Sequence, residues 1–121
     1  LENSVHIFSA RRDVHSLIYD CAMFVSSSDY EGMSNSMLEA MAMGMPCVCT
    51  DCPAGGARAV IKNEVNGLLT PVGDAKALAD AMIRIAENPD FAKELGENAV
   101  KIRQLQSEKI ITDRWVEVIN G

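Results

Sequence analysis

The spacing of apolar and polar residues predicts short strands that alternate with helices. Apolar runs of strand length occur at 5–8, 23–26, 46–50 and 68–70. Apolar residues at helical spacing, or short runs of helix formers, occur at 14–21, 37–43, 57–61, 75–87, 91–102 and 110–119. Strands alternating with helices are typical of an open parallel sheet. We therefore predict an α/β fold, a partial Rossmann-like parallel sheet of about four strands with flanking helices.

The stretch 30–51 carries the strongest local signals. Helix-forming residues at 37–43 follow Ser34, Asn35 and Ser36, which are residue types that cap a helix by accepting hydrogen bonds from its free N–H groups. Gly44 suits the left-handed position after the last turn, and Pro46 cannot continue the helix. We expect a helix of about two to three turns that begins near 34–36 and leads back into a strand.

The start of this helix is a candidate anion site. Free N–H groups and the helix dipole favour phosphate there, the more so beside hydroxyls and a glycine such as Gly32. Ligands of parallel sheets bind at the carboxyl ends of the strands, where the loops after 5–8, 23–26 and 46–50 would meet. The alternative is a capped core helix without a ligand, and the spacing alone gives the two interpretations equal weight.

Composition narrows the class of protein. The chain has 121 residues, 48% of them hydrophobic, which suffices for one domain with a core. A net charge of −6 argues against nucleic acid as the main partner, because binding to its backbone relies on clustered Lys and Arg. No apolar run approaches the roughly 20 residues of a membrane span and no signal peptide opens the chain, so we expect no transmembrane segment and a cytoplasmic location.

Three cysteines lie close together in the sequence. Cys47 and Cys49 alternate along one apolar run, so they should share a strand face, and Cys52 follows the run. A C-x-C-x-x-C metal site would need a fourth ligand, and the two histidines, His6 and His15, lie far back in the chain. We therefore expect buried reduced thiols and no metal.

Two motif-bearing runs resemble a known family. They are SSSDYEGMSNSMLEAMAMGMPCVCTDCPAGG and NEVNGLLTPVGDAKALADAM, and the first contains the pair E-x7-E as Glu31 and Glu39. Both resemble the C-terminal domain of the retaining, GT-B-fold glycosyltransferases called group 1 or family four, over nearly the whole chain from Val5 to about Val118. The motif variants look closest to members that build capsular, exopolysaccharide or lipid-linked glycans.

The resemblance implies a role for individual residues. Glu31 would be the catalytic glutamate that contacts the transferred sugar near the reacting carbon, and Glu39 would bind the ribose hydroxyls of the donor. Arg11 lies in the loop that holds the nucleobase. The sugar and diphosphate would be held by Gly32, Ser34, Asn35 and Ser36. No metal cofactor is expected, because the amides and dipole of the helix would stabilise the leaving group.

The resemblance also implies how the domain is organised. Residues 1–121 would be a truncated nucleotide-sugar-binding domain, with 105–121 as a C-terminal helix. The family's upstream strand–helix unit, whose Arg and Lys grip the diphosphate, and its acceptor-binding N-terminal domain have no counterpart in these residues. The fragment is therefore expected to be inactive alone, and the full-length protein to associate peripherally with the inner face of the membrane. Family members often carry a glutamate where this chain has Ala57-Arg58-Ala59, which changes the expected shape of that loop.

The predicted function is transfer of a sugar from a UDP-linked donor to a glycan or lipid-linked acceptor with retention of configuration. The alternative is a non-catalytic nucleotide-sugar-binding or docking module. A glycoside-hydrolase pair is disfavoured, because Glu31 and Glu39 on one helix would lie about 12 Å apart and such enzymes need at most about 9.5 Å. A dinucleotide-binding dehydrogenase is disfavoured because no G-x-G-x-x-G follows the first apolar run.

Overall fold

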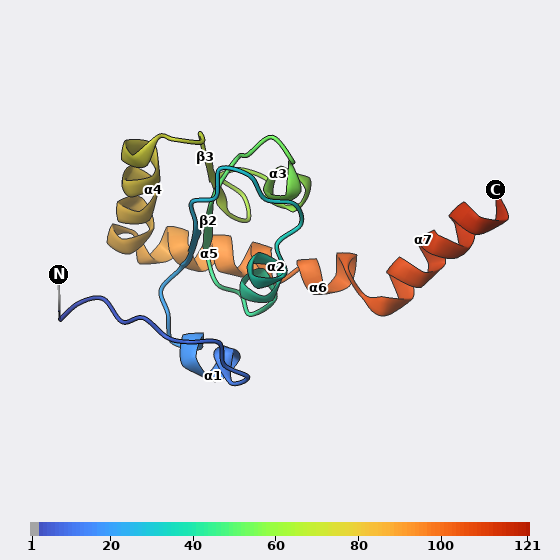
Figure 1. The fold of residues 1–121 in the computed structure, drawn as a ribbon, viewed down its shortest axis with the longest axis horizontal. Helices are drawn as coiled ribbons and strands as arrows, with labels where there is room; N and C mark the ends of the chain where they lie inside the picture. The colour runs from blue at the N-terminus through green and yellow to red at the C-terminus, as the bar shows by residue number, and fades with distance from the viewer. Residues whose placement is uncertain (1–2) are drawn as a thin grey trace.

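The chain folds around a small parallel sheet. A computed structural model describes residues 3–121 (Figure 1). The sheet has the strand order β1-β2-β3, so β2 lies in the centre. The strands are β1 (Phe24–Ser26), β2 (Cys47–Thr50) and β3 (Leu68–Thr70). The helices are α1 (Val14–Ile18), α2 (Asn35–Ala42), α3 (Gly56–Val60), α4 (Ala75–Glu87), α5 (Pro89–Ala99), α6 (Ile102–Leu105) and α7 (Glu108–Asn120).

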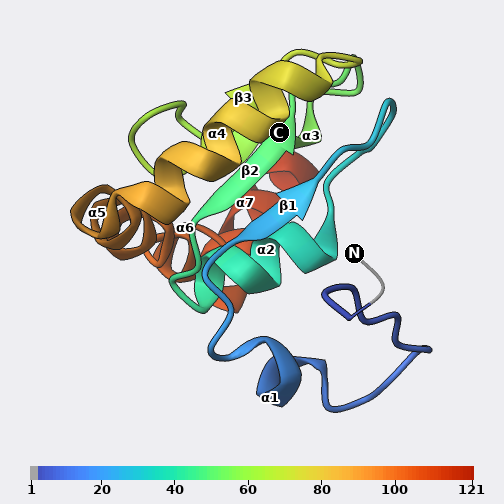
Figure 2. The same ribbon diagram turned by 90° about the vertical axis from the view of Figure 1, so that its left-hand side faces the viewer.

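The helices cover both faces of the sheet. Figures 1 and 2 show α4 on one face, α2 and α3 on the other, and α5 running across the end of the sheet opposite the β1–α2 loop. α7 projects away from the body of the molecule. This layering confirms the predicted fold class, a parallel α/β sheet with flanking helices.

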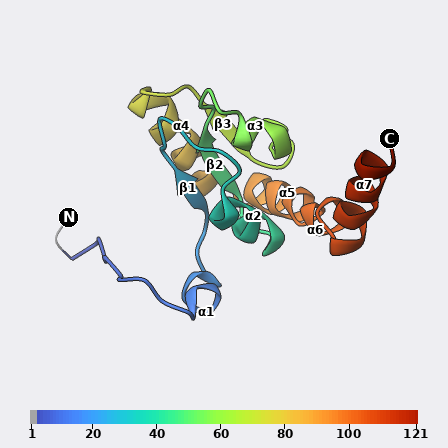
Figure 3. The same cartoon turned by 45° about the vertical axis from the view of Figure 1, so that its right-hand side comes forward.

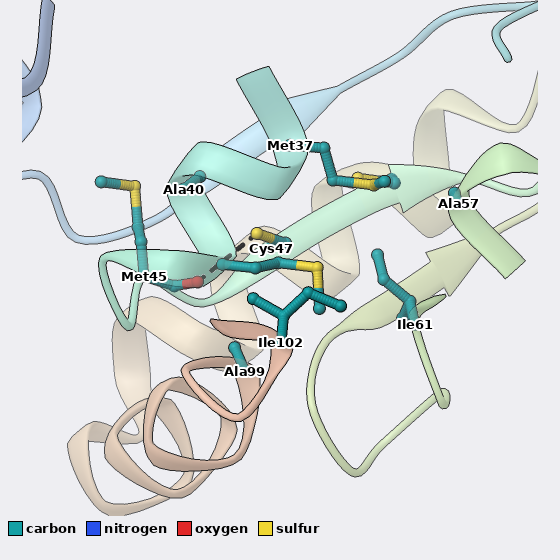
Figure 4. Close-up of a cluster of buried hydrophobic side chains, with 10 residues drawn as sticks. Met37, Ala40, Met45, Cys47, Ala57, Ile61, Ala99 and Ile102 are labelled. Carbon is teal, nitrogen blue, oxygen red and sulfur yellow. Dashed lines mark hydrogen bonds between the residues drawn. The ribbon is translucent and has the colours of Figure 1, made fainter. Parts of the chain in front are cut away.

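The central strand is buried on both faces, as its unbroken apolar sequence predicted. Cys47 and Cys49 point to the face covered by α2, and Val48 points to the face covered by α4. The larger cluster, which Figure 4 draws, contains Met37, Ala40, Met41, Met45, Cys47, Cys49, Ala57, Ile61, Ala99 and Ile102. The smaller cluster contains Val48, Leu68, Ile85 and Leu95. β2 therefore separates the two halves of the core.

Two glycines let α5 approach the turn between α2 and β2. Gly44 has a left-handed φ of +78°, as its position after the helix predicted. Gly96 of α5 lies against the carbonyl oxygen of Gly44 so closely that an added Cβ would overlap this oxygen. The absence of a side chain at Gly96 thus sets the distance between α5 and the start of β2.

The predicted strand at 5–8 does not form. The described sheet has three strands, and Val5, Ile7 and Phe8 are exposed, with Ile7 94% accessible. Figure 3 shows this N-terminal segment lying apart from the sheet. A strand needs backbone hydrogen-bond partners, and in the described part of the chain residues 5–8 have no neighbouring strand with which to pair. The loop after Phe8 is consequently not part of the carboxyl edge of the sheet.

Three helical predictions need smaller corrections. The single helix predicted over 91–102 is two helices, because the amides of Lys101, Arg103 and Gln104 bond to carbonyls three residues back instead of four. In α4 the side that faces the core consists of the buried Ile85 and the half-buried Leu78 and Ala81, whereas Ile83 is exposed. α1 is five residues long, shorter than the predicted two turns. The predicted C-terminal helix over 105–121 is present as α7, although none of its residues is buried.

No helix within residues 3–121 combines the length and the apolar character that a membrane crossing requires.

The contact between Gly96 and Gly44 predicts the effect of a substitution. Gly96→Ala should lower the free energy of unfolding by about 1–3 kcal/mol, because overpacking against a backbone carbonyl outweighs the helix propensity gained. Chemical denaturation of the protein that contains this chain measures the free energy of unfolding. Gly32→Ala is the control, since its Cβ would meet nothing within 4 Å. Gly96→Ala at least as stable as the parent would contradict the close approach.

Candidate functional site

The loop between β1 and α2 lies at the carboxyl edge of the sheet and is tied to β2. The Thr50 hydroxyl donates to the carbonyl of Ser28 at 2.5 Å, and the Cys52 thiol donates to the carbonyl of Glu31 at 3.4 Å. The Ser28 hydroxyl donates to the Glu31 carboxylate at 3.4 Å. Three hydrogen bonds therefore fix the path of the loop and the position of Glu31.

α2 begins as the sequence predicted. Ser34 is the N-cap, with an extended backbone, and its hydroxyl accepts from the amide of Met37 at 3.4 Å. The first amides of a helix have no partners inside it. Among the described residues, no hydrogen bond is made by the amides of Asn35 and Ser36, and both residues are exposed. The start of α2 is therefore open to solvent and presents donors.

A second loop packs directly on the first. Gly56 opens α3 so close to the Gly32 backbone that any Cβ at position 56 would overlap it. Gly55 before it has a left-handed φ of +76°. The two loops enclose a narrow cleft next to Glu31, Gly32 and Ser34, with a volume of about 10 Å³, which is room for about one water molecule. These glycines, which the sequence analysis did not assign to the site, place α3 against the start of α2.

The two predicted carboxylates have different surroundings. Glu31 lines the cleft at the start of α2. Glu39 lies one turn further along α2, outside that cleft, with a side chain 50% exposed. Its carboxylate is 3.2 Å from Nε2 of His15 in α1, which Figure 2 shows beside α2. The structure brings Gly32, Ser34 and Glu31 together and leaves Glu39 on the neighbouring helix surface.

Arg11 lies in the segment before α1. Its guanidinium donates two hydrogen bonds to Asp13, at 2.8 and 2.6 Å, and lies 5.7 Å from the ring centroid of Phe8. The hydrogen bonds raise the pKa of Arg11 and lower the pKa of Asp13. Both side chains are exposed. Among the described residues, the structure joins Arg11 by hydrogen bonds to Asp13 alone.

Arg58 organises the loop in which the sequence lacks the family's glutamate. Its Nε donates to the Asp51 carboxylate at 2.5 Å, and its Nη2 donates to the carbonyls of Asp51 and Cys52, each at 3.2 Å. One side chain thus closes the turn at 51–55. The sequence analysis noted the departure but did not predict this pairing, because the partners are seven residues apart outside any regular element.

The cysteines are free thiols, as predicted. Cys47, Cys49 and Cys52 are buried and Cys21 is exposed. Burial raises the pKa of Cys47 well above its usual range and raises the pKa of Cys49 to about 12. Within residues 3–121, no three His, Cys, Asp or Glu side chains come together as a group that could hold a metal ion. Cys47 and Cys49 pack in the core, and the Cys52 thiol holds the loop at Glu31.

Comparison with known proteins shows which family this chain resembles. A family model described as Glycosyl transferases group 1 matches residues 1–88. The chain is 32% identical over 115 residues to N,N'-diacetylbacillosaminyl-diphospho-undecaprenol alpha-1,3-N-acetylgalactosaminyltransferase of Campylobacter jejuni, covering 95% of this chain and 30% of the relative. It is 29% identical over 122 residues to poly(ribitol-phosphate) alpha-N-acetylglucosaminyltransferase of Staphylococcus aureus, covering 100% and 24%.

Solved structures show the same fold. The Anabaena HepE protein in complex with UDP-glucose superposes with a TM-score of 0.88 at 28% identity, over 99% of this chain and 33% of that chain. The chain spans about a third of the length of the curated relatives it matches. The similarity therefore concerns one part of these larger enzymes.

The buried thiols should differ in reactivity from the exposed one. At pH 8 iodoacetamide should label Cys21 quickly and leave Cys47 and Cys49 unlabelled in the folded protein, because thiolate is the reacting form and burial suppresses it. Peptide mapping by mass spectrometry measures the rates, and labelling in denaturant is the control. Equal rates at Cys21 and Cys49 in the folded state would show that the β2 thiols are accessible.

Proposed function

This chain belongs to the group 1 glycosyl transferases, and we propose that it is the donor-binding part of an enzyme that moves a sugar from a UDP-linked donor to a glycan or lipid-linked acceptor. We propose further that the anomeric configuration is retained and that these residues are inactive without the rest of the enzyme. The relatives support this proposal through their names and through the similarity to a protein solved with UDP-glucose.

The observation that carries the proposal is the open start of α2. A diphosphate at this point would accept hydrogen bonds from the amides of Asn35 and Ser36 and would be stabilised by the helix dipole. Gly32 leaves room for the approach of a sugar, since nothing lies within 4 Å of the position of its missing Cβ. Charge that develops on the leaving diphosphate would meet donors that are already oriented, which needs no metal ion.

We propose that Glu31 acts on the transferred sugar. It precedes the start of α2 by four residues, and its carboxylate accepts from Ser28 while its carbonyl accepts from Cys52. A carboxylate held in this way can accept a hydrogen bond from a sugar hydroxyl and stabilise positive charge near the reacting carbon. We therefore assign the catalytic role to Glu31.

Glu39 and Arg11 would hold the nucleoside. The contact of Glu39 with His15 is exposed, and exposed ion pairs contribute little, so ribose hydroxyls can replace His15 as its partner. Arg11 would stack on or hydrogen-bond the base, which requires its segment, now outside the carboxyl edge of the sheet, to approach the donor. For the whole enzyme we propose a cytoplasmic location with peripheral binding to the inner face of the membrane.

Glu39→Ala should weaken binding of the UDP-sugar about 10- to 100-fold or more, because each hydrogen bond to a charged acceptor is worth about 1.5–3 kcal/mol. Isothermal titration calorimetry of the full-length protein with a panel of nucleotide sugars measures the affinity for the donor. Glu94→Gln on α5 is the control, since Glu94 is exposed and does not line the cleft at the start of α2. Unchanged affinity in Glu39→Ala would remove the ribose assignment.

Glu31→Gln should lower turnover about 10²- to 10³-fold with less than about a tenfold change in donor affinity, because its charge acts mainly in the transition state. Steady-state kinetics of the full-length protein gives both values. A non-catalytic binding module would bind the donor and show no turnover in the parent or the variant. That outcome, or full activity in Glu31→Gln, would refute the catalytic role.

A further inference from the structure

A groove outside the proposed donor site is lined by cations. It lies between α3, the end of α5, α6 and α7, and has a volume of about 470 Å³. Figure 3 shows α3 above the junction of α5 and α6, with α7 beyond them. The cations that line it are Arg58, Lys62, Lys101 and Arg114. None of the acidic residues in the described part of the chain lines this groove.

The cations of the groove differ from those elsewhere in the chain. Of the 11 Lys and Arg side chains, six form ion pairs with carboxylates: Arg11, Arg58, Lys76, Arg84, Lys93 and Lys109. Among residues 3–121, no such pair involves the other five, and three of these five, Lys62, Lys101 and Arg114, line the groove. In a chain with a net charge of −6, this concentrates uncompensated positive charge in one place.

The shape and the walls of the groove indicate what can occupy it. Its sides include the aliphatic residues Val60, Val65, Ile102 and Leu105, and Gln106 adds an amide. A hollow between helices admits an extended chain, whereas a planar bilayer surface cannot follow it. Aliphatic walls suit the C–H faces of sugars or polyols, and cations suit phosphate. These features favour an anionic chain over a membrane surface.

The groove is also joined to the proposed donor site. The first residue of α3, Gly56, packs against Gly32 of the donor loop, and Arg58, Ala59 and Val60 further along α3 line the groove. This helix has five residues, so it is about 7–8 Å long. A chain held in the groove would therefore reach the neighbourhood of the reacting sugar within a few of its units.

We propose that this groove binds a phosphate-bearing acceptor glycan and holds it while its end is extended. The cations that line the groove indicate an anionic occupant. That the occupant is a glycan rests on the proposed function. Two of the relatives have acceptors whose names include phosphate groups. The proposal thus specifies the acceptor class and a contact surface on this part of the enzyme, additional to the acceptor-binding N-terminal domain that the family resemblance implies.

Titration of the full-length protein with a short ribitol-phosphate oligomer tests the proposal, with a neutral maltooligosaccharide of equal length as the comparison. The anionic oligomer should bind, and its affinity should fall as salt rises. The triple variant Lys62→Gln, Lys101→Gln and Arg114→Gln removes the three groove cations that form no ion pair with a described residue. It should weaken binding of the anionic oligomer roughly tenfold or more and make this binding less dependent on salt.

The matched control is the triple variant Lys76→Gln, Lys93→Gln and Lys109→Gln. It removes the same charge from cations that lie outside the groove and are paired with carboxylates four residues away, so its affinity should equal that of the parent. Equal losses in both triple variants, equal binding of the neutral oligomer, or binding of anionic phospholipid vesicles in place of the oligomer would overturn the proposal.

Titration of the same samples with UDP-glucose separates this proposal from the proposed function. The groove variant should bind UDP-glucose as the parent does, because its three residues lie outside the cleft at the start of α2. If UDP-glucose binds but the oligomer does not, the groove proposal alone fails. If the oligomer binds through the three cations but no nucleotide sugar binds, the groove proposal stands and the donor assignment fails.

Discussion

The unpaired amides at the start of α2 are the constraint around which the site is arranged. A helix cannot satisfy its own first N–H groups, and Ser34 takes up only that of Met37. Among residues 3–121 the amides of Asn35 and Ser36 make no hydrogen bond, and both residues are exposed, at the positive end of the helix dipole. A buried helix start would have lost this property, whereas here the loop before it and the glycine at position 32 keep it accessible.

The rest of the fold holds the start of α2 and the loop before it in place. β2 is buried on both faces and holds the β1–α2 loop through Thr50, while Cys52 beyond its end holds the backbone at Glu31. Glycines at 56 and 96 allow α3 and α5 to contact neighbouring backbone directly. The same short helix, α3, then connects the donor loop to the cationic groove, so one packing arrangement accounts for both binding surfaces that we propose.

Local signals in the sequence predicted the features that depend on neighbours in the chain. A helix start near 34–36, the left-handed Gly44 and the bounds of α4 were predicted and are observed, with Ser34 and Asp74 as the N-caps. Features that depend on distant partners were not predictable in this way. The run at 5–8 has the composition of a strand but no strand to pair with, and the contact between His15 and Glu39 joins residues 24 positions apart. The groove likewise combines α3 with helices that follow it by about 40 residues or more, so no motif marks it.

The most direct test of the central claim is a crystal structure of the full-length protein with a bound UDP-sugar. The account predicts that the diphosphate oxygens lie within hydrogen-bonding distance of the amides of Asn35 and Ser36, with the transferred sugar next to Glu31. A diphosphate bound elsewhere, with the start of α2 contacting only solvent, would contradict it.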